Sequence, residues 1–198
     1  MGIVGLIFLL LVIYQAKHIF ADYFFQGAYM LGKFKPGWDF LGPLIAHVAV
    51  HAGFTFGIAL MTLQRLDSLI PTWTAFVWAL GIAAIDAGVH FVMDRVKASP
   101  RYMGRWKPVT AAEYVEARAY LVLAQERRDL RDKILAAQAR ILAPASSVEP
   151  SNEKLEVAAR RRLRGNTLFW WCLGFDQMIH HLTHYVCIYL MLRLAGAL

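Results

Sequence analysis

The chain has 198 residues, of which 58% are hydrophobic, and a formal net charge of +7. With a mean hydropathy of +0.43, this composition excludes an ordinary soluble domain and favours a protein that crosses a membrane several times. The two cysteines, Cys172 and Cys187, lie in apolar sequence, and we interpret them as packing residues.

Four stretches are long and apolar enough to cross a bilayer, which takes about 20 residues. They are residues 3–25, 40–63, 72–96 and 167–192. The first has neither the basic start nor the cleavage site of a signal peptide, so we interpret it as a retained transmembrane helix. The sequence therefore predicts an all-α, polytopic membrane protein with a bundle of four transmembrane helices.

A polar insertion separates the third span from the fourth. Thr110 and Glu113 have the spacing of a capping box, which predicts a helix from there to about Leu142. We interpret "ASSVEPSN" as a linker and residues 153–165 as a second, basic helix. The insertion is thus predicted to be a helical hairpin outside the membrane.

These elements divide the chain into three parts that form one membrane domain. Residues 1–97 hold the first three transmembrane helices, residues 98–165 form the insertion, and residues 166–198 hold the fourth helix. The insertion has 14 basic and 8 acidic residues, a net charge of +6. Because cytoplasmic loops are rich in lysine and arginine, we expect the insertion to be cytoplasmic and both termini to lie outside a bacterial inner membrane.

The basic run of the insertion suggests its partners. We expect anionic lipid headgroups to bind Arg160, Arg161, Arg162 and Arg164. The hairpin of residues 98–165 is also a candidate docking element for another protein or for self-association. Nucleic-acid binding is disfavoured, because acidic residues are interleaved with the basic ones.

All seven histidines lie in the four spans, where four aspartates join them. Ionisable groups are expensive inside a bilayer and usually face the interior of a bundle. Here they repeat at intervals of four residues, which puts each set on one stripe of its helix. The sets are His18 and Asp22; His47 and His51; Asp86, His90 and Asp94; and Asp176, His180 and His184, with His181 beside them.

The depths of these stripes agree with the predicted topology. His18, His47 and His90 lie about seven residues from the cytoplasmic ends of their helices, and Asp176 lies about nine residues from its end. At 1.5 Å per residue these positions are all roughly 10–14 Å deep. The four stripes are therefore predicted to meet in one layer of the bundle.

Imidazole and carboxylate donors suit zinc, with manganese or iron as alternatives. The donors exceed one tetrahedral site, so we predict two ions. The predicted ligands are His18, Asp22, His47, His51, His90, Asp94, Asp176 and His180. We assign Asp86, His181 and Gln26 to catalysis, as proton-handling groups or as partners of the ligands. His184 is interpreted as a packing residue.

Four motifs carry a family resemblance: "HIFADYFFQ", "HVAVH", "HFVMDRVK" and "DQMIHHL". In this order they resemble a family of small bacterial membrane proteins known as domain of unknown function 3307, over residues 14–97 and 169–190. Asp86, His181, His184 and the insertion depart from that pattern. More distantly, the chain is similar to membrane-bound metal-dependent hydrolases, whose His-x-x-x-Asp pairs also occur in zinc-dependent phospholipase C and P1-type nucleases. The resemblance implies hydrolysis of a phosphoester, by analogy.

The leading hypothesis is therefore an intramembrane metal-dependent hydrolase of a phosphoester or other lipid-linked substrate. One alternative is a di-iron membrane hydroxylase or desaturase, because His47-x-x-x-His51 and His180-His181-x-x-His184 resemble the histidine boxes of those enzymes. The other is not an enzyme: a transporter, or a subunit of a larger membrane assembly.

Overall fold

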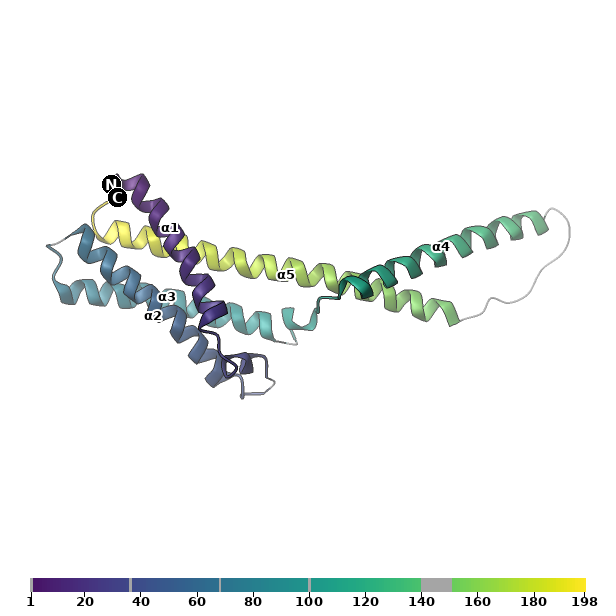
Figure 1. Ribbon diagram of the computed structural model, residues 1–198, viewed down its shortest axis with the longest axis horizontal. Helices are drawn as coiled ribbons and strands as arrows, with labels where there is room; N and C mark the ends of the chain where they lie inside the picture. The colour runs from purple at the N-terminus through teal and green to yellow at the C-terminus, as the bar shows by residue number, and fades with distance from the viewer. Residues whose placement is uncertain (1, 36, 68, 100, 140–150) are drawn as a thin grey trace. The chain divides into compact units, whose positions relative to one another are not determined.

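The computed structural model describes residues 2–35, 37–67, 69–99, 101–139 and 151–198, and every regular element in these residues is a helix (Figure 1). The five α-helices are α1 (Ile3–Ile19), α2 (Leu41–Leu66), α3 (Thr72–Ala98), α4 (Ala111–Ala139) and α5 (Ser151–Leu194). Three short helical segments accompany them: η1 (Phe20–Phe24), η2 (Met30–Phe34) and η3 (Met103–Arg105). The all-α prediction is confirmed.

The chain forms two compact units. The first contains residues 1–105 and 172–198, and the second contains residues 106–171. Helix α5 belongs to both: its residues up to Trp171 are in the second unit, and the remainder is in the first.

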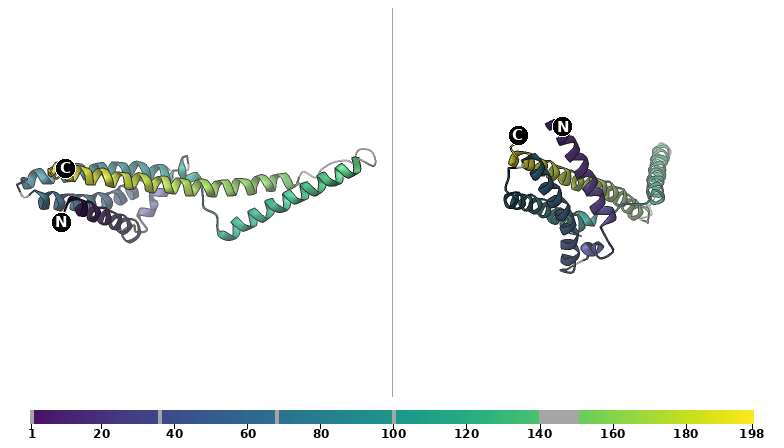
Figure 2. Two further views of the ribbon diagram at one scale, coloured as in Figure 1. Left: turned by 90° about the horizontal axis from the view of Figure 1, so that it is seen from above. Right: turned by 60° about the vertical axis from the view of Figure 1, so that its left-hand side comes forward.

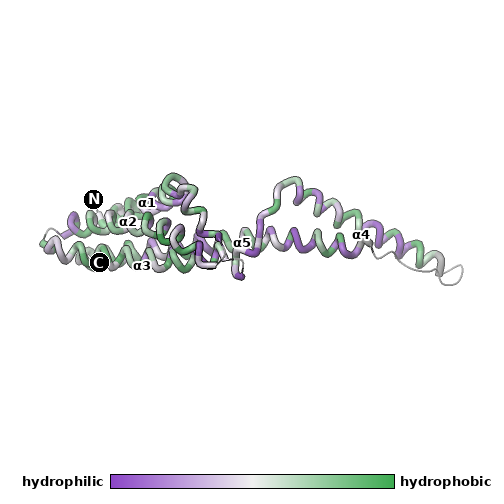
Figure 3. The backbone as a smooth tube through the Cα atoms, turned by 90° about the horizontal axis from the view of Figure 1, so that it is seen from below, coloured by the Kyte–Doolittle hydropathy of each residue, from purple (hydrophilic) through white to green (hydrophobic). Residues whose placement is uncertain are grey.

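Three helical stretches of the first unit are long and apolar enough to cross a membrane: Ile3–Phe24, α2, and the stretch that contains α3. Figure 3 shows the predominance of hydrophobic residues along them. Helix α5 falls outside this set, because Asp176 and three histidines interrupt its apolar sequence. Three of the predicted spans are thus supported, and the fourth stays a prediction.

The helices of the first unit run alternately up and down, with α2 and α3 closely packed along their length (Figures 1 and 2). An apolar core lies where α1 begins and α5 ends, and it contains Leu10, Leu63, Met191 and Leu192. Phe40, Leu44 and Val48 form a second, smaller core near the start of α2. Between these cores the helices present their histidines and aspartates to one another.

The first span does not continue as a regular α-helix to residue 25. It passes at Phe20 into the π-helical turn η1, whose wider hydrogen bonding joins the Phe25 N–H to the Phe20 carbonyl oxygen at 3.0 Å. Asp22 lies inside this turn, and Gln26 lies beyond the end of the helix. Such π-turns occur frequently at functional sites.

The 3₁₀ segment η2 returns from the end of the first span and packs against the start of α2. A Cβ atom added at Gly32 would lie only 2.8 Å from Cγ of Pro43, so this contact requires glycine. It places the next residue, Lys33, in the bundle, where its side chain is buried.

In the second unit the predicted capping box is confirmed. The Glu113 N–H donates to Oγ1 of Thr110 at 3.2 Å, and the Thr110 N–H donates to Oε2 of Glu113 at 2.8 Å. Arg128 of α4 pairs with Glu156 of α5. The insertion thus contains helix α4 and the first part of α5, in contact through this pair. The predicted helix end at Leu142 and residues 145–150 of the predicted linker lie outside the described residues.

One boundary predicted in this region is wrong. We expected a short helix to end at Gly165 and the fourth span to begin at residue 167, but α5 is continuous from Ser151 to Leu194. A single glycine costs a helix only about 1 kcal/mol, which neighbouring residues can offset. Asn166 does not cap a new helix; its Oδ1 accepts the Val109 N–H at 3.1 Å.

Candidate metal centre

The structure brings the eight predicted ligands into three groups whose donor atoms lie within 4.8 Å of one another. The groups are His18, His51 and His90; Asp22, His47 and His51; and Asp94, Asp176 and His180. The first span, α2, α3 and α5 all contribute. Because His51 belongs to two groups, the first two are adjacent.

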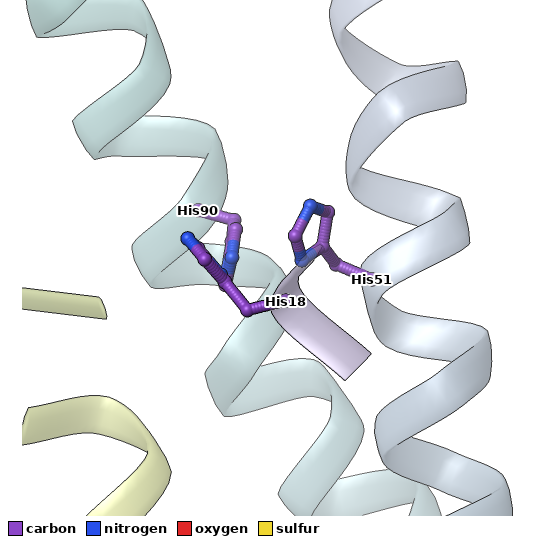
Figure 4. A group of neighbouring side chains, drawn as sticks. All are labelled: His18, His51 and His90. Atoms are coloured by element: carbon purple, nitrogen blue, oxygen red, sulfur yellow. The ribbon is translucent and has the colours of Figure 1, made fainter. Parts of the chain in front are cut away.

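The first group contains imidazoles alone. His18 comes from α1, His51 from α2 and His90 from α3, and their rings face a common space (Figure 4). The ring centroids of His51 and His90 are 4.0 Å apart, and that of His18 lies 5.5 Å from His51 and 6.0 Å from His90. Their side chains are buried.

The second group centres on Asp22 in the π-helical turn. Its Oδ1 lies 3.2 Å from Nε2 of His51 and 3.4 Å from Nε2 of His47, and its Oδ2 lies 3.2 Å from Nε2 of His18. The Asp22 side chain is 25% exposed, more than its histidine partners. Asp22 therefore lies at the open edge of an otherwise buried cluster.

The third group joins α3 to α5. Oδ1 of Asp176 lies 3.8 Å from Nδ1 of His180, and the His180 ring stacks on His90 with centroids 4.2 Å apart. Oδ2 of Asp94 lies 3.0 Å from Nε2 of His47, which belongs to the second group. The three groups thus form one continuous cluster.

Several imidazole nitrogens in this cluster are buried without a hydrogen-bond partner among the described residues. They include both ring nitrogens of His180, Nε2 of His90, and Nδ1 of His18, His47 and His51. Buried polar atoms in proteins are nearly always satisfied. A divalent ion would supply a partner for such nitrogens, so the residues present fit a metal.

Three lysine–aspartate pairs surround the donors, two of them buried and the third, Lys97 with Asp176, partly exposed at the lysine, and none of them was predicted from the sequence. Nζ of Lys17 donates to Asp86 at 2.7 Å, Nζ of Lys33 to Asp94 at 2.9 Å, and Nζ of Lys97 to Asp176 at 2.6 Å. Lys17 carried a usable signal, because a cation inside an apolar span needs an acidic partner. Lys33 lies in the connection after the first span, where the sequence gives no indication that a lysine needs a buried partner.

The three residues assigned to catalysis occupy different surroundings. Asp86 is buried, and its Oδ2 accepts from Lys17 and, at 2.6 Å, from Oγ1 of Thr55. Nδ1 of His181 lies 3.0 Å from Nε2 of Gln15. Oε1 of Gln26 accepts from Lys33 at 3.2 Å. All three border the cluster, and their catalytic roles stay predictions.

His184 lies one turn beyond His180 along α5, beside Tyr14. Its ring centroid is 4.9 Å from that of Tyr14 and 5.6 Å from that of His18. Neither ring nitrogen has a hydrogen-bond partner among the residues that the structure describes. Cys187, one turn further along α5, is fully buried, as the packing interpretation requires, whereas Cys172 is only half-buried.

No family model, curated protein or solved structure matches this chain. The likeness to domain of unknown function 3307 therefore stays a prediction from the sequence motifs, and the function must be argued from the site.

Proposed function

We propose that this protein is an integral membrane enzyme that binds metal at the His/Asp cluster and hydrolyses a phosphoester or similar bond in a lipid-linked substrate. In this proposal residues 167–192 of α5 form the fourth span, and the membrane is the bacterial inner membrane. One observation carries the proposal: donors from four segments of the chain converge in a buried cluster where imidazole nitrogens are otherwise unsatisfied.

The lysine pairs bear on how many ions the cluster accepts. Two of the three aspartates in the donor groups are paired with lysines, Asp94 with Lys33 and Asp176 with Lys97, whereas the contacts of Asp22 are with histidines. A first ion is therefore best placed at Asp22, His47 and His51, where no lysine has to be displaced. A second ion at Asp94, Asp176 and His180 requires Lys33 and Lys97 to move away from the carboxylates.

A divalent ion held by these residues supplies Lewis acidity toward a phosphoryl oxygen. The chain contributes the remaining functions. Lys33 and Lys97 place two positive charges beside the third group, where they attract an anionic phosphoryl group. Asp22 lies at the exposed edge, where a substrate headgroup enters. Zinc is the proposed metal, with manganese or iron as alternatives.

Elemental analysis of the purified protein tests the metal site. We expect zinc to copurify with the wild-type chain and His18→Ala with His90→Ala to lose it. His184→Gln is the matched control, since His184 is equally buried beside His18 but lies outside the three donor groups. Absence of metal from the wild type, or unchanged content in the double variant, would refute the proposal.

Hydrolysis is tested separately. We expect the protein in detergent to cleave bis(p-nitrophenyl) phosphate, and the double variant His18→Ala with His90→Ala to be inactive. If the protein contains metal but cleaves neither this probe nor phospholipid in mixed micelles, the metal site stands and the proposed hydrolase activity is refuted. Bound iron in place of zinc would instead favour the di-iron hydroxylase alternative.

The buried lysine–aspartate pairs favour a second candidate, a proton or ion transporter, because carboxylates paired inside membranes also serve such pathways. In that case the protein would contain no stoichiometric metal. Reconstituted vesicles with an internal pH dye would acidify in response to a proton gradient, and Lys33→Met would change the rate. Metal content and proton flux thus separate the two candidates.

The insertion is the part of the chain that we propose binds partners. Arg160, Arg161, Arg162 and Arg164 would contact anionic headgroups at the cytoplasmic surface. Replacing the four arginines with glutamine should weaken binding of detergent-solubilised protein to phosphatidylglycerol vesicles, but not to phosphatidylcholine vesicles. If instead another protein copurifies through residues 98–165 and no metal is present, the chain is a subunit of a larger assembly.

A further inference from the structure

An apolar pocket of about 360 Å³ lies between α1 and the last part of α5. Its walls are Ile7 and Leu11 on α1, Tyr185, Ile188, Tyr189 and Leu192 on α5, and Leu198 beyond the end of α5. These residues belong to the first unit. On α1 they lie within a stretch that is long and apolar enough to cross a membrane, so the pocket lies at the depth of the hydrocarbon.

One helical turn separates the pocket walls from two residues that border the metal cluster, Gln15 and His181. Gln15 lies one helical turn beyond Leu11, and His181 lies one turn before Tyr185, so each is about 6 Å along its helix from the pocket wall. The side chains of Gln15 and His181 approach to 3.0 Å and join the two helices at this point. The His181 ring centroid is in turn 6.1 Å from that of His18.

The chemistry of the pocket defines its occupant. In the hydrocarbon layer the available molecules are lipids, and predominantly apolar walls favour a hydrocarbon chain over a headgroup. Ile7 and Leu11 are partly buried and face the pocket, whereas the neighbouring Phe8 and Val12 are 64% and 65% exposed on the outer side of α1. The pocket is therefore a built groove between two helices, distinct from the general lipid-facing surface.

We propose that this groove binds the aliphatic chain of the lipid substrate, with the chain lying between α1 and α5 and the headgroup directed past Gln15 and His181 to the metal cluster. This inference rests on the proposed function and names its substrate class: an amphiphile whose scissile polar bond lies next to a hydrocarbon chain. A water-soluble phosphoester would leave the groove unused.

Photolabelling of the full-length protein tests the groove. The probe is phosphatidylglycerol with a diazirine in one acyl chain, added to the protein in detergent with or without excess unlabelled phosphatidylglycerol. We expect saturable labelling that maps to the α5 wall between Tyr185 and Leu192. Leu11→Trp and, separately, Ile7→Trp fill the groove and should lower this labelling by about tenfold, equivalent to about 1.4 kcal/mol of binding free energy.

The sequence offers a matched control beside each blocking variant. Val12→Trp and Phe8→Trp add an indole at nearly the same depth but on the exposed side of α1, and they should leave the labelling unchanged. Equal labelling of blocked and control variants, or labelling that excess unlabelled lipid does not reduce, would refute the proposal that the groove binds a lipid chain. Helix content by circular dichroism shows whether each variant is folded.

Failure of the groove and failure of the metal hypothesis give different results. The double variant His18→Ala with His90→Ala should lose metal yet keep the saturable labelling. Labelling without metal in the wild type rejects the proposed hydrolase and keeps the groove as a lipid site. Metal without competed labelling keeps the metal site and rejects the groove.

Discussion

The buried pair of Lys17 and Asp86 allows a quantitative test of how this bundle is stabilised. Nζ of Lys17 and Oδ2 of Asp86 are 2.7 Å apart, and the two side chains are 1% and 0% exposed. Lys17→Met leaves the Asp86 carboxylate with neutral partners, Oγ1 of Thr55 at 2.6 Å from Oδ2 and Nδ1 of His90 at 3.3 Å from Oδ1. Removing one partner of a buried ion pair typically costs about 3–5 kcal/mol, because the other charge stays buried and unpaired.

The double variant Lys17→Met with Asp86→Asn removes both charges. We expect it to recover most of the lost stability, because replacing both members of a buried pair with neutral groups is often close to neutral. For a chain of this size about 3–5 kcal/mol corresponds to a fall in Tm of about 6–20 °C. The single variants should show this fall, and the double variant should lie within a few degrees of the wild type.

Unfolding of the four proteins in mixed micelles with increasing dodecyl sulfate gives the coupling energy of the pair. Arg128→Met is a control from the second unit: Arg128 is 43% exposed in its pair with Glu156, so its loss should cost about 0–1 kcal/mol. If the double variant is as unstable as the sum of the single variants, Lys17 and Asp86 are not coupled and the reasoning is refuted. Metal retained by the double variant would further show that Asp86 is not needed for binding.

Three other predictions follow from single contacts. His51→Ala should lower the metal content more than His184→Ala, because His51 belongs to two donor groups; equal losses in elemental analysis would contradict this. Gly32→Ala should destabilise the bundle by about 1–3 kcal/mol in the same unfolding assay, because its Cβ would collide with Pro43, whereas Gly27→Ala, in open space, should not. Hydrogen bonds from the Thr110 backbone N–H and side chain hold the pKa of Glu113 below its ordinary value of 4.5. The capping box should therefore persist above pH 4.5 and weaken as the pH falls through the lowered pKa. An NMR titration of Glu113 with a midpoint of 4.5 or higher would contradict this prediction.

The convergence of the donors followed from helical geometry. Residues four apart share a helix face, so His18 with Asp22, and Asp86 with His90 and Asp94, required only that their spans be helices. The shared depth then predicted that His90 lies beside His51 and His180. In the structure the His90 ring centroid is 4.0 Å from that of His51 and 4.2 Å from that of His180. Local pattern and topology were sufficient here because ionisable groups in a bilayer have few other places to lie.

Other features depend on contacts between distant residues. Lys33 lies in the connection between the first span and α2, yet it reaches Asp94, a residue 61 positions away, because η2 packs on Pro43. The π-helical turn at Asp22 has no composition that distinguishes it from the α-helix before it. The continuity of α5 through Gly165 reflects a balance of small helix-propensity terms that neighbouring residues decide. None of these could be derived from spacing alone.

The order of the ion pairs along the chain has a consequence for biosynthesis. Lys17 with Asp86 and Lys33 with Asp94 are complete once α3 has been made, as are the two donor groups that share His51. The pair of Lys97 with Asp176 forms later, because Asp176 is synthesised 79 residues after Lys97. At about 5–20 residues per second that delay is roughly 4–16 s. A bundle of the first three helices would hold Asp86 and Asp94 neutralised during this interval, while the ribosome synthesises the polar insertion and the last helix that closes the cluster.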